Sequence, residues 1–340
     1  MRRRYTATDV SSAIAASIAV GALRPIHSAA VATPGVLINA NARSVRRDPD
    51  LVARLRRLAS PERTALTSQL DEIEPALAAL LDRGIDALAL VGGDGTLPHT
   101  LTRLLDGRDP TALPAIVPTR GGTVNTIARS LGVRGGPEQT LAQLLRGELA
   151  EQRRAVVRVA ADGGAPLFGF LFINGVGVSF LELYYAGRTG PAGAFSVVAR
   201  LSASALVGGP LARRAFAAFK GELEVDGERI DQRHFTVIAA GAVRHLGLGF
   251  APLYSAGSDP ERIHLAATGA SAARIALELP ALRAGSRGTS LTHFPCRDAV
   301  LRLTAPLAWS IDAELFPPAQ RLAIGAGPAL RFLCPPARRA

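Results

Sequence analysis

The stretch Leu88–Thr96 places the strongest constraint on the fold of this chain, because a continuous apolar run ends abruptly in glycines. Residues 88–91 are all apolar, which is typical of a strand buried on both faces of a parallel sheet. The sequence Gly92-Gly93-Asp94-Gly95-Thr96 follows, and leucines then recur at helical spacing. A strand, a glycine turn and a helix together present free backbone N–H groups to a phosphate. The stretch therefore predicts a phosphate-binding turn, with a tight turn capped by Asp94 as the alternative.

The acidic side chain within this turn indicates a metal ion. A carboxylate inside an anion-binding cradle would repel a bare phosphate, so Asp94 favours a bridging cation. Mg²⁺ is the expected ion, because it is usually bound by one or two carboxylates together with the phosphates of a substrate.

A second glycine turn follows the next predicted strand. Residues 114–118 are apolar and lead into Thr119-Arg120-Gly121-Gly122-Thr123-Val124-Asn125. The first predicted strand, residues 36–38, ends in Asn39-Ala40-Asn41, and asparagine side chains both donate and accept hydrogen bonds. Because the carboxyl ends of parallel strands share one edge of the sheet, we expect these turns to face one nucleotide. Arg120 has two open interpretations, a phosphate contact or a solvated loop side chain.

The pattern of apolar residues divides the chain into segments. Strands and helices alternate up to about residue 150, which predicts a doubly wound parallel α/β domain over residues 35–150. Residues 151–328 contain short strands separated by turns, interrupted by helical segments at 194–206 and 272–282, and predict a mostly antiparallel, β-rich domain that holds the substrate. Residues 1–34 are expected to be a flexible or disordered leader. Residues 329–340 are expected to form a C-terminal strand and tail, and whether this strand returns to the first domain stays open.

Composition narrows the class of partner. The net charge of +11 comes almost entirely from arginine and fits nucleic acid, an anionic membrane surface or a nucleotide-rich site. Aromatic residues make up only 5% and do not alternate with basic ones, which argues against a nucleic-acid partner. The two cysteines provide no disulfide framework, so a reducing cytoplasm is expected. The basic leader is interpreted as a frayed extension, with contact to anionic lipid or a weak export signal as alternatives.

The order of these motifs resembles that of the diacylglycerol kinase catalytic domain, and in particular that of bacterial soluble lipid kinases related to diacylglycerol and sphingosine kinases. The resemblance rests on Asn39-Ala40-Asn41, on Gly92–Thr96, on the run from Gly122 to Gly132, and on Ser310-Ile311-Asp312-Ala313-Glu314. It extends over about residues 36–335. The Gly-Gly-Asp-Gly-Thr motif is shared with NAD kinases, whereas the run from Gly122 to Gly132 is more specific to the lipid kinases.

The resemblance implies ATP and Mg²⁺ as cofactors and gives roles to particular residues. The residues implied in nucleotide binding are Asn39, Asn41, Gly92, Gly93, Asp94, Gly95, Thr96, Gly122, Thr123 and Asn125. The implied catalytic residues are Asp312 as the base, Glu314 as an assisting group or metal ligand, and Asp94, which is also the metal ligand. If Asp312 and Glu314 lie on one strand they face the same side, and neighbouring carboxylates raise each other's proton affinity, as a base requires.

A second acidic pair competes with this assignment. The segment Val225-Asp226-Gly227-Glu228 matches the Asp-Gly-Glu pattern of the family better than the late segment does, yet Asp-Gly between two strands predicts a hairpin turn. The position in the family order favours Asp312 and Glu314. The chain also departs from the family pattern, with Ala313 in place of glycine, His99 in place of an acid and Thr126 in place of an aspartate.

Together these features predict an ATP-dependent lipid kinase that transfers the γ-phosphate to a lipid hydroxyl, of diacylglycerol or a sphingoid-like lipid, within phospholipid biosynthesis. The expected location is cytoplasmic, with peripheral association at the membrane surface where the lipid substrate lies, and a homodimer is left open. The alternatives are an NAD kinase-like enzyme and a catalytically weak nucleotide- or lipid-binding protein. The lipid itself is not identified, because acyl pockets are built from generic apolar side chains.

Overall fold

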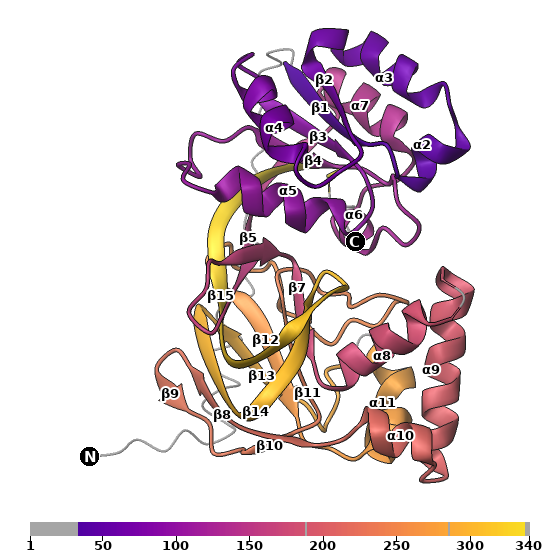
Figure 1. The fold of residues 1–340 in the computed structure, drawn as a ribbon, viewed down its shortest axis with the longest axis vertical. Helices are drawn as coiled ribbons and strands as arrows, with labels where there is room; N and C mark the ends of the chain where they lie inside the picture. The colour runs from indigo at the N-terminus through magenta and orange to yellow at the C-terminus, as the bar shows by residue number, and fades with distance from the viewer. Residues whose placement is uncertain (1–32, 188, 285, 337–340) are drawn as a thin grey trace.

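The structure is a computed structural model that describes residues 33–336, except residues 188 and 285, and it consists of two domains stacked end to end (Figure 1). The expectation of a flexible leader over residues 1–34 falls almost wholly outside the described residues. Among those residues, no helix has the length and apolar character needed to cross a membrane.

The N-terminal domain is built on parallel strands in the order β2-β1-β3-β4. Its strands are β1 (Pro34–Asn39), β2 (Thr64–Thr67), β3 (Ala87–Val91) and β4 (Ala115–Pro118). Its helices are α2 (Arg43–Arg47), α3 (Leu51–Ala59), α4 (Ile73–Leu81), α5 (Thr96–Leu105), α6 (Thr126–Ser130) and α7 (Pro137–Leu145), with a short 3₁₀ turn at Pro61–Arg63.

Both faces of this sheet are covered, which explains why its strands are continuously apolar. Along β1, Val36 and Ile38 pack with buried leucines of α3 and α7, whereas Leu37 packs with those of α4 and α5. Successive side chains of a strand point to opposite faces, so an apolar residue is needed at every position. The doubly wound architecture expected from the sequence is therefore confirmed.

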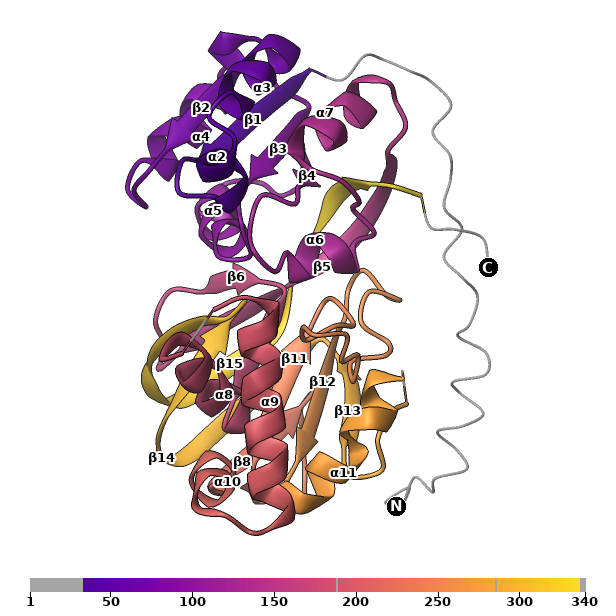
Figure 2. The same cartoon turned by 90° about the vertical axis from the view of Figure 1, so that its right-hand side faces the viewer.

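The C-terminal domain is mostly antiparallel, with its helices gathered on one side (Figures 1 and 2). Its strands are β5 (Ala150–Ala161), β6 (Leu167–Gly169), β7 (Leu171–Asn174), β8 (Phe219–Val225), β9 (Glu228–Arg229), β10 (His234–Phe235), β11 (Val237–Gly241), β12 (Ile263–Thr268), β13 (Thr292–Cys296), β14 (Asp298–Ile311) and β15 (Glu314–Cys334). Its helices are α8 (Val176–Tyr185), α9 (Pro191–Leu206), α10 (Pro210–Ala215) and α11 (Ala272–Arg283). The change from parallel to antiparallel strands agrees with the sequence expectation.

Strand β15 joins the two domains. It starts at Glu314, pairs antiparallel with β14 and β5, and ends beside β4, where Phe332 pairs in parallel with Ile116. The question left open by the sequence is thereby answered, because the segment 330–333 runs within the sheet of the N-terminal domain. Hydrogen-bonded strands thus connect the two domains without interruption.

Candidate active site

The two glycine turns lie against each other at the carboxyl ends of β3 and β4. A Cβ atom at Gly121 would lie 2.8 Å from the carbonyl oxygen of Gly92, and one at Gly122 would overlap the Cα of Gly93. Helix α2 also contacts the second turn, because the Ser44 N–H donates to the Gly121 carbonyl at 2.9 Å. Several of these glycines are therefore required for close packing between the turns, in addition to any approach of a phosphate.

Asp94 connects the first glycine turn to the second. Its carboxylate accepts hydrogen bonds from the backbone N–H groups of Thr126 at 3.0 Å and Ile127 at 3.3 Å, at the start of α6. Burial raises the pKa of the Asp94 carboxyl, and these backbone donors partly oppose that effect. The alternative role of Asp94 as the cap of its own helix is wrong, because the residue preceding α5 is Gly95 and no side chain caps that helix.

Asn39, the last residue of β1, and Asn41 form hydrogen bonds between the segments at the edge of the cleft. The amide of Asn39 donates to the Thr96 hydroxyl at 3.0 Å, and its oxygen accepts from the Asn41 N–H at 2.8 Å. The Asn41 amide donates to the Ser68 carbonyl at 2.9 Å, after β2. Asn39, Asn41 and Thr96 all line the main cavity described below, as expected for nucleotide-binding residues.

Gly92 and Asn125, also expected to bind the nucleotide, lie outside the wall of that cavity. A Cβ atom at Gly92 would overlap the Thr96 side chain, so this glycine permits the turn into α5. The side chain of Asn125 spans its own turn, accepting from Gly122 N at 2.7 Å and donating to Gly122 O at 2.9 Å. Both residues therefore shape the turns, and their expected role in nucleotide binding stays a prediction.

Asp312 lies in the hairpin turn between β14 and β15, where Ile311 pairs with Glu314. The backbone of Asp312 and Ala313 has φ of 48° and 71°, as in a two-residue turn with both central residues left-handed. The expectation that Asp312 and Glu314 lie on one strand is therefore wrong. Asp312 lies within the turn and Glu314 lies directly after it, and both residues line the cavity, one from the turn and the other from the start of β15.

The carboxylate of Asp312 is buried, with 5% of the residue exposed, and is held by backbone amides. It accepts from Phe170 N at 3.0 Å and from Leu171 N at 2.8 Å, at the break between β6 and β7. Burial raises the pKa of the Asp312 carboxyl well above its usual range, the Phe170 and Leu171 amides oppose this, and the charges of Asp94 and Glu314 add to it.

Two residues at this site were not assigned a role from the sequence. Nε2 of His99, in the second turn of α5, lies 2.7 Å from Glu314 Oε2, and this contact connects the two domains across the cleft. The Tyr185 hydroxyl at the end of α8 donates to the Ala313 carbonyl at 2.7 Å. Burial raises the pKa of the Tyr185 hydroxyl. The sequence offered one indication of this role. His99 lies three residues after Thr96, which places both side chains on the same face of the predicted helix.

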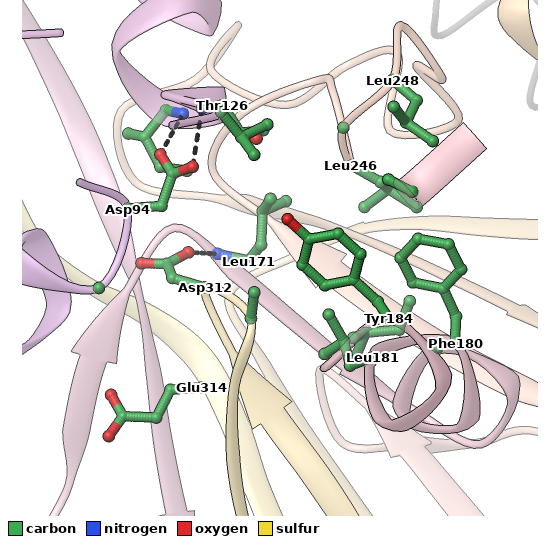
Figure 3. Close-up of a pocket in the computed structure, with 18 of the residues that line it drawn as sticks. Asp94, Thr126, Leu171, Phe180, Leu181, Tyr184, Leu246, Leu248, Asp312 and Glu314 are labelled. Carbon is green, nitrogen blue, oxygen red and sulfur yellow. Dashed lines mark hydrogen bonds between the residues drawn. The ribbon is translucent and has the colours of Figure 1, made fainter. Parts of the chain in front are cut away.

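A single cavity of about 1110 Å³ connects the glycine turns to the interior of the C-terminal domain. The carboxylates of Asp94, Asp312 and Glu314 lie along one side of it, and apolar side chains such as Phe180 and Leu246 line the other (Figure 3). Deeper in the C-terminal domain the walls come from α8, α9 and α11, with Phe180, Leu181, Val198, Leu201, Ile275, Leu279 and Leu282. The cavity therefore has a polar end formed by both domains and an apolar end formed by the second.

The competing acidic pair lies away from this cavity. Asp226 occupies the turn between β8 and β9, has φ of 47° and accepts from the N–H groups of Arg297 and Asp298 at 2.8 and 2.9 Å. The hairpin interpretation of Asp226-Gly227 is therefore confirmed. Arg120 is also absent from the wall of the main cavity and lines a second, smaller one.

The acidic residues of the site suit a metal ion that arrives with phosphates. Within residues 33–336, apart from 188 and 285, no three His, Cys, Asp or Glu side chains gather closely enough to hold a metal ion. Mg²⁺ commonly keeps several waters and is bound by one or two carboxylates plus substrate phosphates. Asp94, which lies between the two glycine turns, fits such a role, because a phosphate bound at the turns would supply the remaining oxygen ligands.

Comparison with known proteins shows what the N-terminal domain and the whole fold are similar to. Residues 35–156 match the model of the diacylglycerol kinase catalytic domain. No curated protein sequence matches the chain. A "putative diacylglycerol kinase" from Bacillus anthracis strain Sterne has a similar structure, with a TM-score of 0.69, 12% identity, and coverage of 92% of this chain and 100% of that chain. A diacylglycerol kinase structure from the same strain has a TM-score of 0.63, 12% identity, and coverage of 91% and 99%.

At this level of identity the structural likeness shows the fold, whereas the family match concerns the residues that form the two glycine turns. Those turns, the strands before them and the helices after them all lie within residues 35–156. The resemblance inferred from the sequence is thereby confirmed, in that residues 35–156 match the model of the diacylglycerol kinase catalytic domain.

Proposed function

We propose that the protein is an ATP-dependent lipid kinase that transfers the γ-phosphate of ATP to the hydroxyl of a lipid with at least one long acyl or alkyl chain. The observation that carries this proposal is the cavity of about 1110 Å³, which runs from the glycine turns past Asp312 into an apolar chamber. In this order along the cavity, the glycine turns would hold the phosphate donor, Asp312 would accept the proton, and the apolar chamber would hold the lipid chain.

The nucleotide end is formed by the N-terminal domain. The phosphates of ATP would lie at the turn that precedes α5, where the backbone N–H groups and the helix dipole favour an anion. Thr96, Gly122 and Thr123 line this end of the cavity. Mg²⁺ bound with the nucleotide at Asp94 would neutralise phosphate charge, which is the main requirement of phosphoryl transfer.

Asp312 is the proposed acceptor of the substrate proton. As the lipid oxygen forms its bond to the γ-phosphorus, the bond from that phosphorus to the β–γ bridging oxygen breaks, ADP leaves, and the hydroxyl proton passes to the Asp312 carboxylate. The raised pKa of the Asp312 carboxyl makes it a better proton acceptor than an ordinary aspartate. The amides of Phe170 and Leu171 fix its orientation.

The apolar chamber supports a lipid as the phosphate acceptor. Ile275 and Leu279 of α11 and Val198 of α9 are only half-buried although they face inward, because they line the cavity. An acyl or sphingoid chain would cover these side chains, which fits diacylglycerol or a sphingoid-like lipid. An NAD kinase-like activity is disfavoured, because the polar dinucleotide NAD gains nothing from an apolar chamber of this kind.

We further propose that the C-terminal domain docks on an anionic membrane through α9 and α11, which lie side by side in Figure 2 and form walls of the chamber. Four apolar side chains protrude there, with exposed fractions of 82% for Val207, 67% for Leu277, 58% for Leu206 and 51% for Phe195. The sequence has no acidic residue between Glu182 and Glu222, whereas Arg200, Arg213, Arg214 and Lys220 lie in that interval. Protruding apolar residues among basic ones are typical of surfaces that bind anionic lipid.

Transfer of label from γ-radiolabelled ATP would test the kinase proposal. The wild-type protein would be assayed with Mg²⁺ in mixed micelles containing diacylglycerol, sphingosine or ceramide, with NAD as a parallel acceptor. Asp94→Ala and Asp312→Asn should each lower lipid phosphorylation by at least about 100-fold. Asp226→Asn is the matched control, because Asp226 has a similar left-handed turn and similar backbone donors but lies away from the cavity.

Label in NAD, or loss of activity in Asp226→Asn with retention in Asp312→Asn, would contradict the proposal. Docking would be tested by sedimentation with vesicles of phosphatidylglycerol and phosphatidylcholine. Leu206→Glu should weaken vesicle binding, whereas Leu66→Glu on β2, where the wild-type leucine is 46% exposed, should leave it unchanged. Equal effects of the two substitutions would argue against a specific docking face.

A further inference from the structure

A second cavity, of about 420 Å³, lies in the N-terminal domain and is lined by basic side chains. Arg43 and Arg47 come from α2, and Arg120 comes from the loop after β4. The opposite wall is the backbone of Gly135 and Gly136, just before α7. We call this cavity the arginine pocket. It shares Arg43, Gly122 and Thr123 with the wall of the main cavity, whereas Arg47 and Arg120 belong to the arginine pocket alone.

No carboxylate of the described part of the chain lines the arginine pocket. The acidic residues nearest in sequence are already engaged, because Asp48 and Glu138 both bind Arg54, at 2.5 and 2.8 Å. Arg54 lowers the pKa of the Asp48 carboxyl, which keeps that group ionised and bound to Arg54. No acidic side chain in the wall of the pocket therefore neutralises the positive charge of its arginines.

Polar atoms at the pocket also lack partners. The Nε atom of Arg120 and the hydroxyl oxygen of Ser44 are both shielded from solvent and have no hydrogen-bond partner among the described residues. Both residues line the pocket, together with Thr123 and Asn125. A buried donor without an acceptor is costly, and an anion placed at these groups would supply the acceptor oxygens.

We propose that the arginine pocket is a second phosphate-binding site, in addition to the glycine turns that face the main cavity. Arginine is suited to this ligand, because its planar guanidinium binds phosphate oxygens in a bidentate manner and stays charged. At Gly136 a Cβ atom would meet no other atom within 4 Å, so the backbone there is open to a ligand. The phosphate could belong to free inorganic phosphate, to the polyphosphate of the nucleotide or to the headgroup of a phospholipid, and the chemistry of recognition is the same for all three.

Calorimetric titration of inorganic phosphate into the full-length protein tests this proposal without turnover, so that a failure of the kinase proposal would leave the result intact. Arg47→Gln combined with Arg120→Gln should raise the Kd for phosphate at least about tenfold, which corresponds to the loss of a charge-assisted contact. Arg47→Gln alone should give a smaller increase, and because Arg47 is exposed this variant is expected to fold normally.

The matched control is Arg56→Gln combined with Arg57→Gln, which removes the same charge from exposed positions of the neighbouring helix α3. It should bind phosphate as the wild type does. An unchanged Kd in the pocket variants, an equal loss in the control, or no phosphate binding to the wild type would each overturn the proposal.

Two further titrations assign the source of the phosphate. With the main cavity saturated by a non-hydrolysable ATP analogue and Mg²⁺, continued binding of phosphate would support a separate site for the free ion. Displacement of phosphate by the analogue, together with weaker analogue binding in the pocket variants, would support occupancy by the nucleotide's own phosphates. Weaker sedimentation of the pocket variants with phosphatidylglycerol vesicles, relative to the α3 control, would support a lipid headgroup.

Discussion

Replacing Asp312 with asparagine should separate the contribution of its negative charge from that of its hydrogen bonds. Asparagine keeps an acceptor oxygen for Phe170 N and Leu171 N, so we expect the hairpin between β14 and β15 to be retained. It loses the ability to accept a proton. The pKa of the Asp312 carboxyl is raised well above its usual range, mainly by burial, so in the wild type its charge is present at a cost to stability.

The sign of the pH dependence follows from this raised pKa. Between the unfolded pKa of about 3.9 and the higher folded pKa of the Asp312 carboxyl, the folded state binds more protons than the unfolded state. The free energy of unfolding therefore falls as pH rises through this window, by up to about 1.4 kcal/mol per pH unit for one group. Asp312→Asn lacks this dependence, so it should gain stability relative to the wild type as pH increases and keep a constant difference above the folded pKa.

Activity should change in the opposite direction over the same window. Only ionised Asp312 can accept the proton, so kcat/KM of the wild type should rise about tenfold per pH unit below the folded pKa of Asp312 and level off above it. Urea denaturation of both proteins from pH 4 to pH 9, with lipid phosphorylation by the wild type over the same range, tests both expectations. Parallel stability curves for wild type and variant would refute the assignment of a raised pKa to Asp312.

Three further predictions concern the hairpin and its neighbours. Ala313→Gly should raise the free energy of unfolding by about 0.5–1 kcal/mol in urea denaturation, because Ala313 has φ of 71° and glycine adopts this backbone without strain. Gly169→Ala should cost about 1–3 kcal/mol in the same assay and lower kcat, because the new Cβ would lie 2.6 Å from Asp312 Oδ2. A double-mutant cycle with His99→Leu and Glu314→Leu, measured by urea denaturation, should give a coupling of roughly 0.5–1 kcal/mol, since the contact is a partly exposed hydrogen bond.

The sequence was most informative where both faces of an element are buried. The run of residues 88–91 predicted a strand, and β3 covers Ala87–Val91. The requirement for apolar side chains at every position of such a strand is a local property, so a single sequence reveals it. The glycine turns were recognisable for the same reason, since turns of this kind leave few other residues possible.

The hairpin at Asp312 illustrates the opposite case. Asp226-Gly227 was recognised as a turn because glycine is the usual residue at a left-handed position, and its φ is 84°. Ala313 has a left-handed backbone without being glycine, so Ser310–Glu314 resembled a continuous strand in the sequence. The pairing of Ile311 with Glu314 and the contacts of Asp312 with Phe170 and Leu171 fix the turn. Phe170 and Leu171 lie about 140 positions from Asp312 in the sequence, so no local sequence pattern indicates these contacts.

The structural roles of Gly92 and Asn125 within the turns were not predicted, for a related reason. Both belong to motifs whose positions were recognised, but whether a motif residue faces the cleft or closes the turn depends on packing between the two turns. The overlap of a Cβ at Gly122 with Gly93 shows how closely the turns approach each other. Because the two turns are in direct contact, some residues of each motif are needed for that contact, and the remaining residues of the motif face the cavity.

The connection between the domains gives the site its geometry. In the proposed reaction the nucleotide lies at the glycine turns of the N-terminal domain and the base is Asp312 of the C-terminal domain, so transfer would require a fixed distance between them. Strand β15 begins at Glu314, immediately after the turn that contains Asp312, and ends with Phe332 beside Ile116 of β4, just before the second glycine turn. One continuous strand, paired with β14 and then with β5, thus connects the proposed base to the sheet that carries the glycine turns. The contact between His99 of the N-terminal domain and Glu314 of β15 is a second connection between the domains, across the cleft. In the proposed reaction, the alignment of Asp312 with the phosphate therefore depends on β15 as much as on the residues that line the cavity.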